Sequence, residues 1–237
     1  WYEKIKMSYS MKMTNTVSAK EDTIFTKETL NKMKNGIQHT IPVSTSLTLF
    51  NYINVSPSFN YTERWYFKKV SQQWNNETKT VDTLDPEYGF WRIYNYNASV
   101  SANTTIYGTY TAKKKERKLQ AVRHTLTPNI GFAYSPDFSR QRYGFYETVQ
   151  TDTTGRFKVY SPFTDNAYGV PGSGQQFNLT FGLSQSLEAK VRTKDTVKKI
   201  KIIDQISING SYNFLADSMR LSTLPIQLRT TIYQNIG

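Results

Sequence analysis

The stretch WYEKIKMSYSMKMTNTVSA, residues 1–19, alternates apolar and polar side chains with a period of two. Its apolar parity contains Ile5, Met7, Tyr9, Met11, Met13 and Val17. The other parity is polar and carries Lys6 and Lys12. Successive side chains of a β-strand point to opposite faces. The stretch therefore predicts a strand with one apolar and one polar face.

Seven further stretches alternate in the same way, so we expect eight strands. The expected strands span residues 1–18, 37–49, 53–68, 90–110, 121–135, 176–192, 200–215 and 224–233. The connections are short at 50–52, 111–120 and 193–199, long at 19–36, 69–89 and 136–175, and intermediate at 216–223. Outer-membrane barrels place short turns in the periplasm and long loops outside. The pattern predicts an all-β fold, an antiparallel transmembrane β-barrel whose first strand runs outward.

A soluble antiparallel sandwich would also alternate. However, several expected strands exceed 14 residues, whereas strands of globular proteins cluster near about 5–6 residues. Aromatic residues also gather toward strand ends, as at Tyr61, Trp65, Tyr66 and Phe67. Such positions are typical of the interfacial girdle of a membrane barrel. Strand length, loop alternation and aromatic placement together favour the barrel.

The polar parity of the expected strands is rich in asparagine, serine and threonine, which suits a hydrated lumen. A lysine facing lipid at the bilayer midplane costs about 2–4 kcal/mol. Lys6 and Lys12 are therefore expected to face the lumen, and Arg64 and Arg123 share that face. A slip of one residue would exchange the two faces of a strand, so we expect the register to be tightly held.

Composition narrows the possible classes of protein. Only 38% of the residues are hydrophobic, but 14% are aromatic, led by 17 tyrosines and 13 phenylalanines. No segment approaches the run of about 18 apolar residues that a membrane helix needs. The sequence has no cysteine, which excludes disulfides and thiolate ligands within it. The net charge of +12 is compatible with nucleic acid, anionic lipid or solvated turns.

No arrangement of residues predicts a catalytic, metal or cofactor site. His39 and His124 lie on different expected strands, and no further metal ligand is visible near either. The sequence lacks the G-x-S-x-G context of a hydrolase serine. Gly169, Gly172 and Gly174 precede a strand and not a helix, so they indicate a turn and not a phosphate cradle. We expect a protein that is not an enzyme and has no cofactor.

Two basic clusters fall at short connections on the expected periplasmic side. The first contains Lys113, Lys114, Lys115, Arg117 and Lys118, and the second contains Lys194, Lys198, Lys199 and Lys201. They could form a docking or anionic-lipid surface, but solvated turns are the favoured interpretation. Binding of nucleic acid would need aromatic and basic residues on one surface. Here the aromatic residues lie on the opposite faces, so no nucleic-acid partner is expected.

Particular motifs resemble the LptD family of outer-membrane lipopolysaccharide-assembly proteins, in its Bacteroidetes form. They are QHTIP at 38–42, VSPS at 55–58, YTERWY at 61–66, RHTLTP at 123–128, YSPDF at 134–138, LEAKV at 187–191, SYNF at 211–214 and ADS at 216–218. The resemblance spans nearly the whole sequence. It implies that residues 1–237 are part of one barrel domain, with a periplasmic jellyroll and further strands outside this sequence. We therefore expect that the eight strands do not close a ring alone.

The resemblance implies a barrel in the outer membrane that receives lipopolysaccharide from periplasmic bridge proteins and releases it into the outer leaflet. A plug lipoprotein of the LptE type is the implied partner in the lumen, beside lipopolysaccharide and outer-membrane lipid. A porin-like or substrate-uptake barrel is the alternative, since the same strands would serve it. We hypothesise that Lys6, Lys12, Arg64 and Arg123 contact the plug or phosphorylated headgroups. Simple hydration of a wide pore is the alternative role for these four residues.

Overall fold

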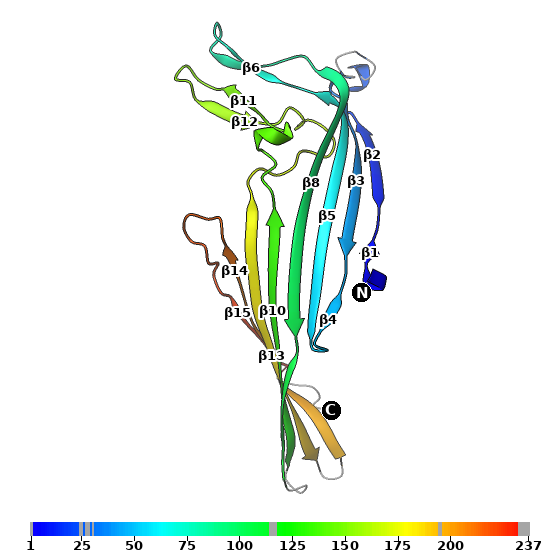
Figure 1. Cartoon of the computed structure of the whole chain (residues 1–237), viewed down its shortest axis with the longest axis vertical. Coiled ribbons are helices and arrows are strands. Elements are labelled where there is room, and N and C mark those ends of the chain that lie inside the picture. Colours follow the sequence, from blue (N-terminus) through cyan, green and yellow to red (C-terminus); the bar gives the residue numbers. More distant parts are fainter. Residues whose placement is uncertain are drawn as a thin grey trace.

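A computed structural model describes residues 2–23, 26, 29, 31–113, 118–193 and 196–231. The fold is all-β, with long antiparallel strands side by side in one curved sheet (Figure 1). This confirms the fold class predicted from the alternation. Within the described residues, no helix has the length and apolar character needed to cross a membrane.

The large sheet contains β1 (Lys6–Met7), β2 (Ser10–Thr16), β3 (Lys34–Ser44), β4 (Leu47–Leu49), β5 (Ile53–Lys69), β8 (Glu87–Thr104), β9 (Ile106–Thr111), β10 (Leu119–Ser135), β13 (Gln176–Thr193), β14 (Thr196–Asn213) and β15 (Ile226–Arg229). Two small hairpins accompany it, β6 (Gln72–Asn75) with β7 (Thr80–Thr83) and β11 (Glu147–Gln150) with β12 (Phe157–Tyr160). Short 3₁₀ turns lie at Tyr2–Lys4, Glu21–Thr23 and Gln141–Tyr143.

The strands follow one another in chain order across the sheet. The path is β1-β3-β5-β8-β10-β13-β14-β15, while β2 pairs with β3, β4 with β5 and β9 with β10. All of these pairings are antiparallel. In the described part of the chain, neither β1 nor β2 pairs with β15, so the sheet stays open. An open up-and-down sheet is what part of a larger barrel would form.

Three expected strands are interrupted, and a proline lies at each interruption. The first strand breaks between β1 and β2, where Ser8 faces Pro42 and donates its N–H to the Pro42 carbonyl at 3.3 Å. The second breaks between β3 and β4, where Thr45 donates its N–H to the Pro57 carbonyl at 3.2 Å. The fourth breaks after Thr104, near Pro128 of β10. Proline has no N–H, so each ladder loses one hydrogen bond there.

Other boundaries also differ from the expectation. The second strand begins at Lys34 and not at residue 37, and the last ordered pairing is limited to Ile226–Arg229. Residues 232–233 of the expected last strand lie outside the described residues. The turn after β13 is tighter than expected, because pairing continues to Thr193 opposite Thr196. Lys198, Lys199 and Lys201 consequently lie on β14 and not in a turn, which corrects the second basic cluster.

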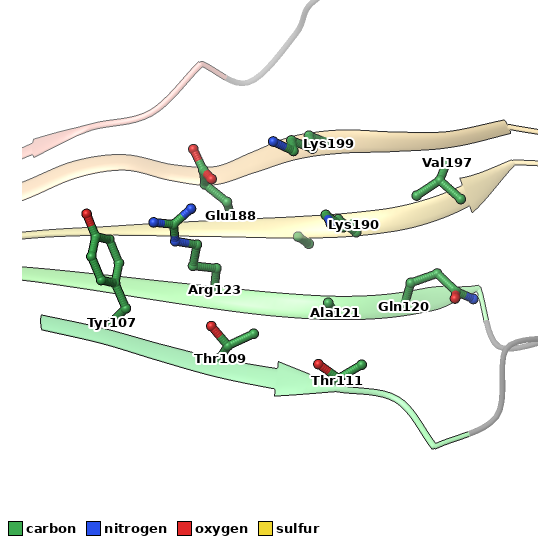
Figure 2. Close-up of a pocket in the computed structure, with 11 residues that line it drawn as sticks. Tyr107, Thr109, Thr111, Gln120, Ala121, Arg123, Glu188, Lys190, Val197 and Lys199 are labelled. Atoms are coloured by element: carbon green, nitrogen blue, oxygen red, sulfur yellow. The ribbon is translucent and has the colours of Figure 1, made fainter.

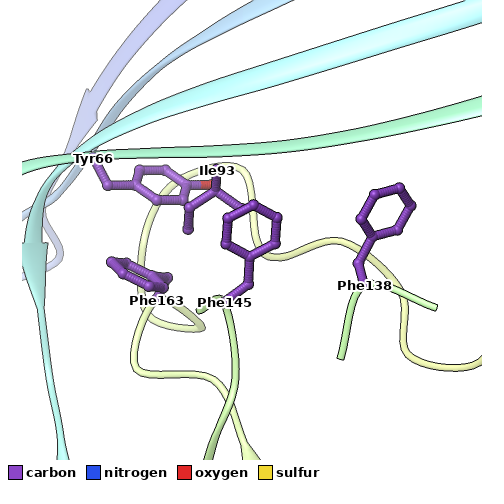
Figure 3. Close-up of a cluster of buried hydrophobic side chains, with 5 residues drawn as sticks. All are labelled: Tyr66, Ile93, Phe138, Phe145 and Phe163. Carbon is purple, nitrogen blue, oxygen red and sulfur yellow. The ribbon is translucent and has the colours of Figure 1, made fainter. Parts of the chain in front are cut away.

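The long connections carry structure of their own. Residues 69–89 contain the hairpin β6–β7, and residues 136–175 contain the hairpin β11–β12. We call residues 136–175 the long loop. Its Phe138, Phe145 and Phe163 form a buried cluster with Tyr66 of β5 and Ile93 of β8 (Figure 3). The long loop was expected only as a connection between strands, and it also packs against β5 and β8.

Four strands continue beyond the short turn between β4 and β5. Thr104 is the last residue of β8 opposite β5, where it faces Ile53, and the pairing of β10 then passes to β9 at Ile106. Residues 106–111, 119–126, 185–193 and 196–206 form this projection, which we call the short-turn extension. Figure 1 shows it at the bottom of the sheet. Register shifts on both sides of Leu187 mark where the extension begins, since bulges increase the local bend.

Candidate functional site: the polar face of the sheet

One face of the sheet is lined by polar side chains that bond across neighbouring strands. The hydroxyls of Ser58 and Ser99 lie 2.7 Å apart. One row further along, Asn60 Nδ2 donates to Asn97 Oδ1 at 3.0 Å. Because these pairs are in register, the asparagine and serine parities of β5 and β8 share one face. The polar face predicted from the alternation is therefore present.

The opposite face is apolar and uncovered. Met7, Met11 and Met13 of the first two strands are between 59% and 74% exposed. Further exposed apolar side chains of this face are Phe59, Val100, Ile130 and Phe132. A contiguous exposed apolar surface of this kind marks contact with lipid or protein. Contact with membrane lipid fits its extent along the sheet.

Aromatic side chains border this apolar face toward the long loops. Trp65 packs its ring edge-on against Phe90, with centroids 5.6 Å apart, and donates its indole N–H to Glu63 at 2.6 Å. Tyr61 also donates its hydroxyl to Glu63. Tyr66 was expected in this girdle, but that expectation was wrong. Its side chain lies on the polar side of β5, beneath the long loop.

The two histidines occupy separate environments. His39 is buried, with Nδ1 2.7 Å from the Tyr9 hydroxyl and its ring centroid 4.3 Å from that of Trp65. His124 Nε2 lies 3.2 Å from Gln185 Oε1. Within the described residues, His, Asp and Glu side chains form no group of three suited to a metal. Each histidine is held by its own neighbours on a different part of the sheet.

Two of the four predicted lumen residues lie in one cross-strand row. Lys12 faces Gln38 of β3, which in turn faces Arg64 of β5. Two strand spacings separate Lys12 from Arg64, roughly 10 Å. Lys6 lies elsewhere, opposite Ser44. Arg123 is further away still, on the short-turn extension, with its guanidinium 4.2 Å from the Tyr107 ring centroid.

Arg64 has incompletely satisfied hydrogen-bonding capacity. Its Nη1 donates to Asn95 Oδ1 at 2.6 Å, on the polar face. Its Nε is buried and has no hydrogen-bond partner within the described part of the chain. A guanidinium offers five donors in a planar fork that matches carboxylates and phosphates. Nε could reach an external oxygen only if the side chain moved, so any ligand on this face would have to meet the Nη groups of Arg64.

The long loop covers the polar face at one end, a feature that the sequence reasoning missed. Tyr66 donates its hydroxyl to the Gly169 carbonyl at 2.6 Å. The hydroxyls of Thr14 and Tyr168 lie 2.6 Å apart. Both contacts come from the polar side of β2 and β5. The aromatic content of residues 138–146 was the available signal, since a fully solvated loop would not need it.

The same loop wraps the free edge of β8. β10 pairs with β8 only from Ala98 to Asn103, so residues 87–97 have no strand on that side within the described residues. Ile93 and Tyr94 point to opposite faces because they are consecutive. Both nevertheless pack against the loop cluster, with the Tyr94 and Phe145 ring centroids 5.3 Å apart. The loop thus protects an edge that would otherwise expose backbone donors and acceptors.

The base of the long loop is closed by a carboxylate. Asp137 Oδ1 accepts hydrogen bonds from the Ser139 hydroxyl at 2.6 Å and from the Gly174 N–H at 2.9 Å. The hydrogen bond from the Ser139 side chain, with those from the two backbone N–H groups, lowers the pKa of Asp137. Its carboxylate therefore remains charged at neutral pH and ties the two ends of the loop together.

The first basic cluster is only partly visible. Lys113 and Lys118 flank the connection between β9 and β10, while Lys114, Lys115 and Arg117 lie outside the described residues, as does Lys194. The described members of the second cluster lie on a paired strand of the extension. The alternation of strand faces therefore controls where their charges point.

Comparison with known proteins identifies the family. No curated protein and no solved structure matches the chain. The sequence model of the LptD protein family matches residues 1–237. Members of this family are outer-membrane proteins that transport and assemble lipopolysaccharide, and they are not enzymes. The match covers the whole sheet and both of its faces, and the chain belongs to the LptD protein family.

Proposed function

We infer that this sheet is part of the barrel wall of a lipopolysaccharide translocon in the outer membrane. The observation that carries the proposal is the pairing of a polar face, rich in asparagine and serine, with an uncovered apolar face, in a chain that belongs to the LptD family. The apolar face contacts lipid, and the polar face borders the path of the headgroup. Neutral amide and hydroxyl groups suit this path, because they form hydrogen bonds with sugars but no ion pairs that would retain a charged headgroup.

The direction of the wall follows from its two ends. The long loops contain the hairpins β6–β7 and β11–β12 and lie together at one end of the sheet (Figure 1). Outer-membrane barrels direct such loops outward and short turns to the periplasm. We place the long loop at the cell surface and the short-turn extension in the periplasm. Lipopolysaccharide then arrives from the extension side and leaves to the outer leaflet.

A plug lipoprotein of the LptE type and periplasmic bridge proteins complete the proposed machine. The row of Lys12, Gln38 and Arg64 is the proposed contact of the polar face with the plug or with a phosphorylated headgroup. The guanidinium of Arg64 supports this role, because its planar fork of donors matches carboxylates and phosphates. Lys6 contributes one more positive charge on the same parity near Ser44.

Photo-crosslinking tests the proposal at two consecutive positions of β5, one on the polar face and one on the apolar face. A photoreactive phenylalanine analogue at Asn60 of the full-length protein should crosslink in cells to lipopolysaccharide or a lipoprotein. The matched control is Phe59, whose side chain points to the apolar face, and it should capture surrounding lipid, with lipopolysaccharide of the outer leaflet included, but no lipoprotein. A position-60 probe that captures neither product would contradict the translocon and favour an uptake barrel.

A further inference from the structure

The short-turn extension contains a hollow of about 600 Å³ on the side continuous with the polar face (Figure 2). Register places the charged part of its lining on one face of the strands, because Thr109 faces Arg123, Arg123 faces Glu188, and Lys190 faces Lys199. Arg123 is also on the lumen parity of β10, with Asn129. The hollow is therefore in line with the polar face and beyond the barrel's short-turn end.

The cations of this hollow are poorly compensated by the protein itself. Lys190 and Lys199 are directly opposite each other on β13 and β14, a like-charge arrangement that destabilises a sheet. Neither forms an ion pair within the described residues. Arg123 faces Glu188 across the ladder, yet its described contact is with the ring of Tyr107. Three cations thus meet one carboxylate in a single hollow.

Neutral donors complete the lining. Thr109 and Thr111 of β9 contribute hydroxyls, and Gln120 contributes a side-chain amide. A set of cations and hydroxyl donors with a single carboxylate favours an oxyanion ligand. A phosphate monoester, with close to two negative charges near pH 7, would relieve the repulsion between Lys190 and Lys199. The planar guanidinium of Arg123 adds a bidentate partner for its oxygens.

We propose that this hollow is a binding site for the phosphate monoester of a phosphorylated sugar headgroup at the short-turn end of the wall. Its volume falls within the range of about 300–1,000 Å³ typical of small-ligand sites. An acidic protein partner would instead need a surface of about 800 Å² per side. The assignment of the phosphate to a headgroup rests on the proposed function, but the binding of a phosphorylated sugar can be measured independently of transport.

The test uses the full-length protein in detergent, titrated calorimetrically with glucosamine 1,6-bisphosphate. The double variant Lys190→Gln/Lys199→Gln should weaken binding at least tenfold, and Arg123→Gln should weaken it further. The folded barrel should persist, because the two lysines repel each other in the native sheet. Lys79→Gln/Lys158→Gln is the matched control, since it removes two exposed lysines from the hairpins at the opposite end. It should leave the affinity unchanged.

Equal loss of affinity in both double variants would overturn the proposal, because net charge alone would then explain binding. Displacement of the sugar by inorganic phosphate at equal concentration would overturn the assignment to a headgroup. Equal competition by hexaglutamate would overturn it in favour of an acidic protein. These outcomes are independent of the crosslinks from Asn60, so failure of the transport proposal and failure of this site are distinguishable.

Discussion

The carboxylate of Asp137 accepts a hydrogen bond from the N–H of Gly174, which lies 37 residues further along the chain, at 2.9 Å. This bond joins the two ends of a loop that covers both the polar face and the edge of β8. The ladder of β10 and β13 already brings the loop ends together where Ser135 faces Gln176, and this bond extends that closure into the loop. A single carboxylate thus contributes to holding a large surface element in place.

Acidification should release the base of the long loop. The folded-state pKa of Asp137 is lowered from an unfolded value of about 3.9. Its contribution is therefore fully present above about pH 4 and is lost as the pH falls through the folded pKa. Because the carboxylate is partly solvated, we expect about 1 kcal/mol or less from it. Proteolysis of the loop should accelerate below pH 4 and be reversible on neutralisation.

Asp137→Asn should remove this pH dependence, since the amide cannot titrate. The variant should show faster loop cleavage at pH 7 and little additional change at pH 3.5. Asp82→Asn in the hairpin β6–β7 offers a control that leaves the loop base intact. A pH profile of cleavage identical in wild type and Asp137→Asn would refute the role of this carboxylate.

Phe163→Ala should detach the long loop without unfolding the barrel. Phe163 is 3% exposed and lies against Tyr66 and Trp91, with ring centroids 6.2 and 6.1 Å away. Truncating a buried phenylalanine costs about 3–5 kcal/mol, here from the stability of the loop. Limited proteolysis should cut within residues 136–175, while heat-modified electrophoretic mobility stays unchanged. The control is Phe157→Ala, since Phe157 is 69% exposed, and it should resist cleavage like wild type.

Gly182→Ala should strain the polar face. A Cβ at this position would lie 2.5 Å from Asn209 Oδ1 and 2.7 Å from Asn129 Nδ2, closer than real contacts allow. Both atoms are the far ends of asparagine side chains, which can rotate away, so we expect about 1 kcal/mol, the low end of the cost of overpacking. The temperature at which the barrel loses its folded mobility should fall, and Asn129→Ser should partly restore it. Gly172→Ala meets nothing within 4 Å, so an equal effect there would contradict the explanation.

Lys68→Met should loosen the start of β3. Lys68 is 4% exposed and donates from Nζ to the carbonyls of Asn31 and Met33 at 2.8 and 2.9 Å. Its loss leaves two acceptors unsatisfied, at about 1–3 kcal/mol each when buried. Hydrogen exchange should increase over residues 31–36. Lys69→Met removes a more exposed ion pair with Glu87, which should cost about 1 kcal/mol or less and leave this exchange unchanged.

Replacing Lys12 and Arg64 by glutamine should weaken plug or headgroup contacts without disturbing assembly. Glutamine at position 64 can still donate to Asn95, which Arg64 contacts at 2.6 Å. We expect lower crosslinking from Asn60 and less lipopolysaccharide at the surface at unchanged barrel abundance. Lys158→Gln, which removes one charge from the hairpin β11–β12, is the control. Normal surface lipopolysaccharide in the double variant would contradict the proposed contact. The alternative role, hydration of a wide pore, would then be the explanation for Lys12 and Arg64.

The alternation of side chains was sufficient to predict the sheet and its two faces, whereas the open ring was expected from the family resemblance. The predicted faces were correct for residues such as Met11 and Asn97, because each side chain of a strand can point to only one of two faces. The long loop could not be predicted in this way. The burial of Tyr66, Phe145 and Phe163 depends on contacts between segments about 80 to 100 residues apart, which no local period encodes.

The candidate site was predicted only in part. Lys12 and Arg64 share a row, but this follows from register, which the sequence constrains only through its hydrophobic pattern. Arg123 was assigned to a lumen, and the structure places it on a projection beyond the short turns. Lys190 was not singled out, because its partner Lys199 comes from another strand. The clustering of like charges becomes visible only once the two strands are paired.

Pro42, Pro57 and Pro128 have a mechanical consequence for the wall. They lie on β3, β5 and β10, and each takes one hydrogen bond from a ladder. Pro42 lies in the same cross-strand row as Asn60 of β5, and Pro128 lies in the row of Ile53. Pro57 is itself on β5, between these two rows, so the three prolines form a diagonal across the sheet. We expect a crease along this diagonal, where the sheet bends most easily and its amides exchange first. Curvature of the wall would then be concentrated along one line.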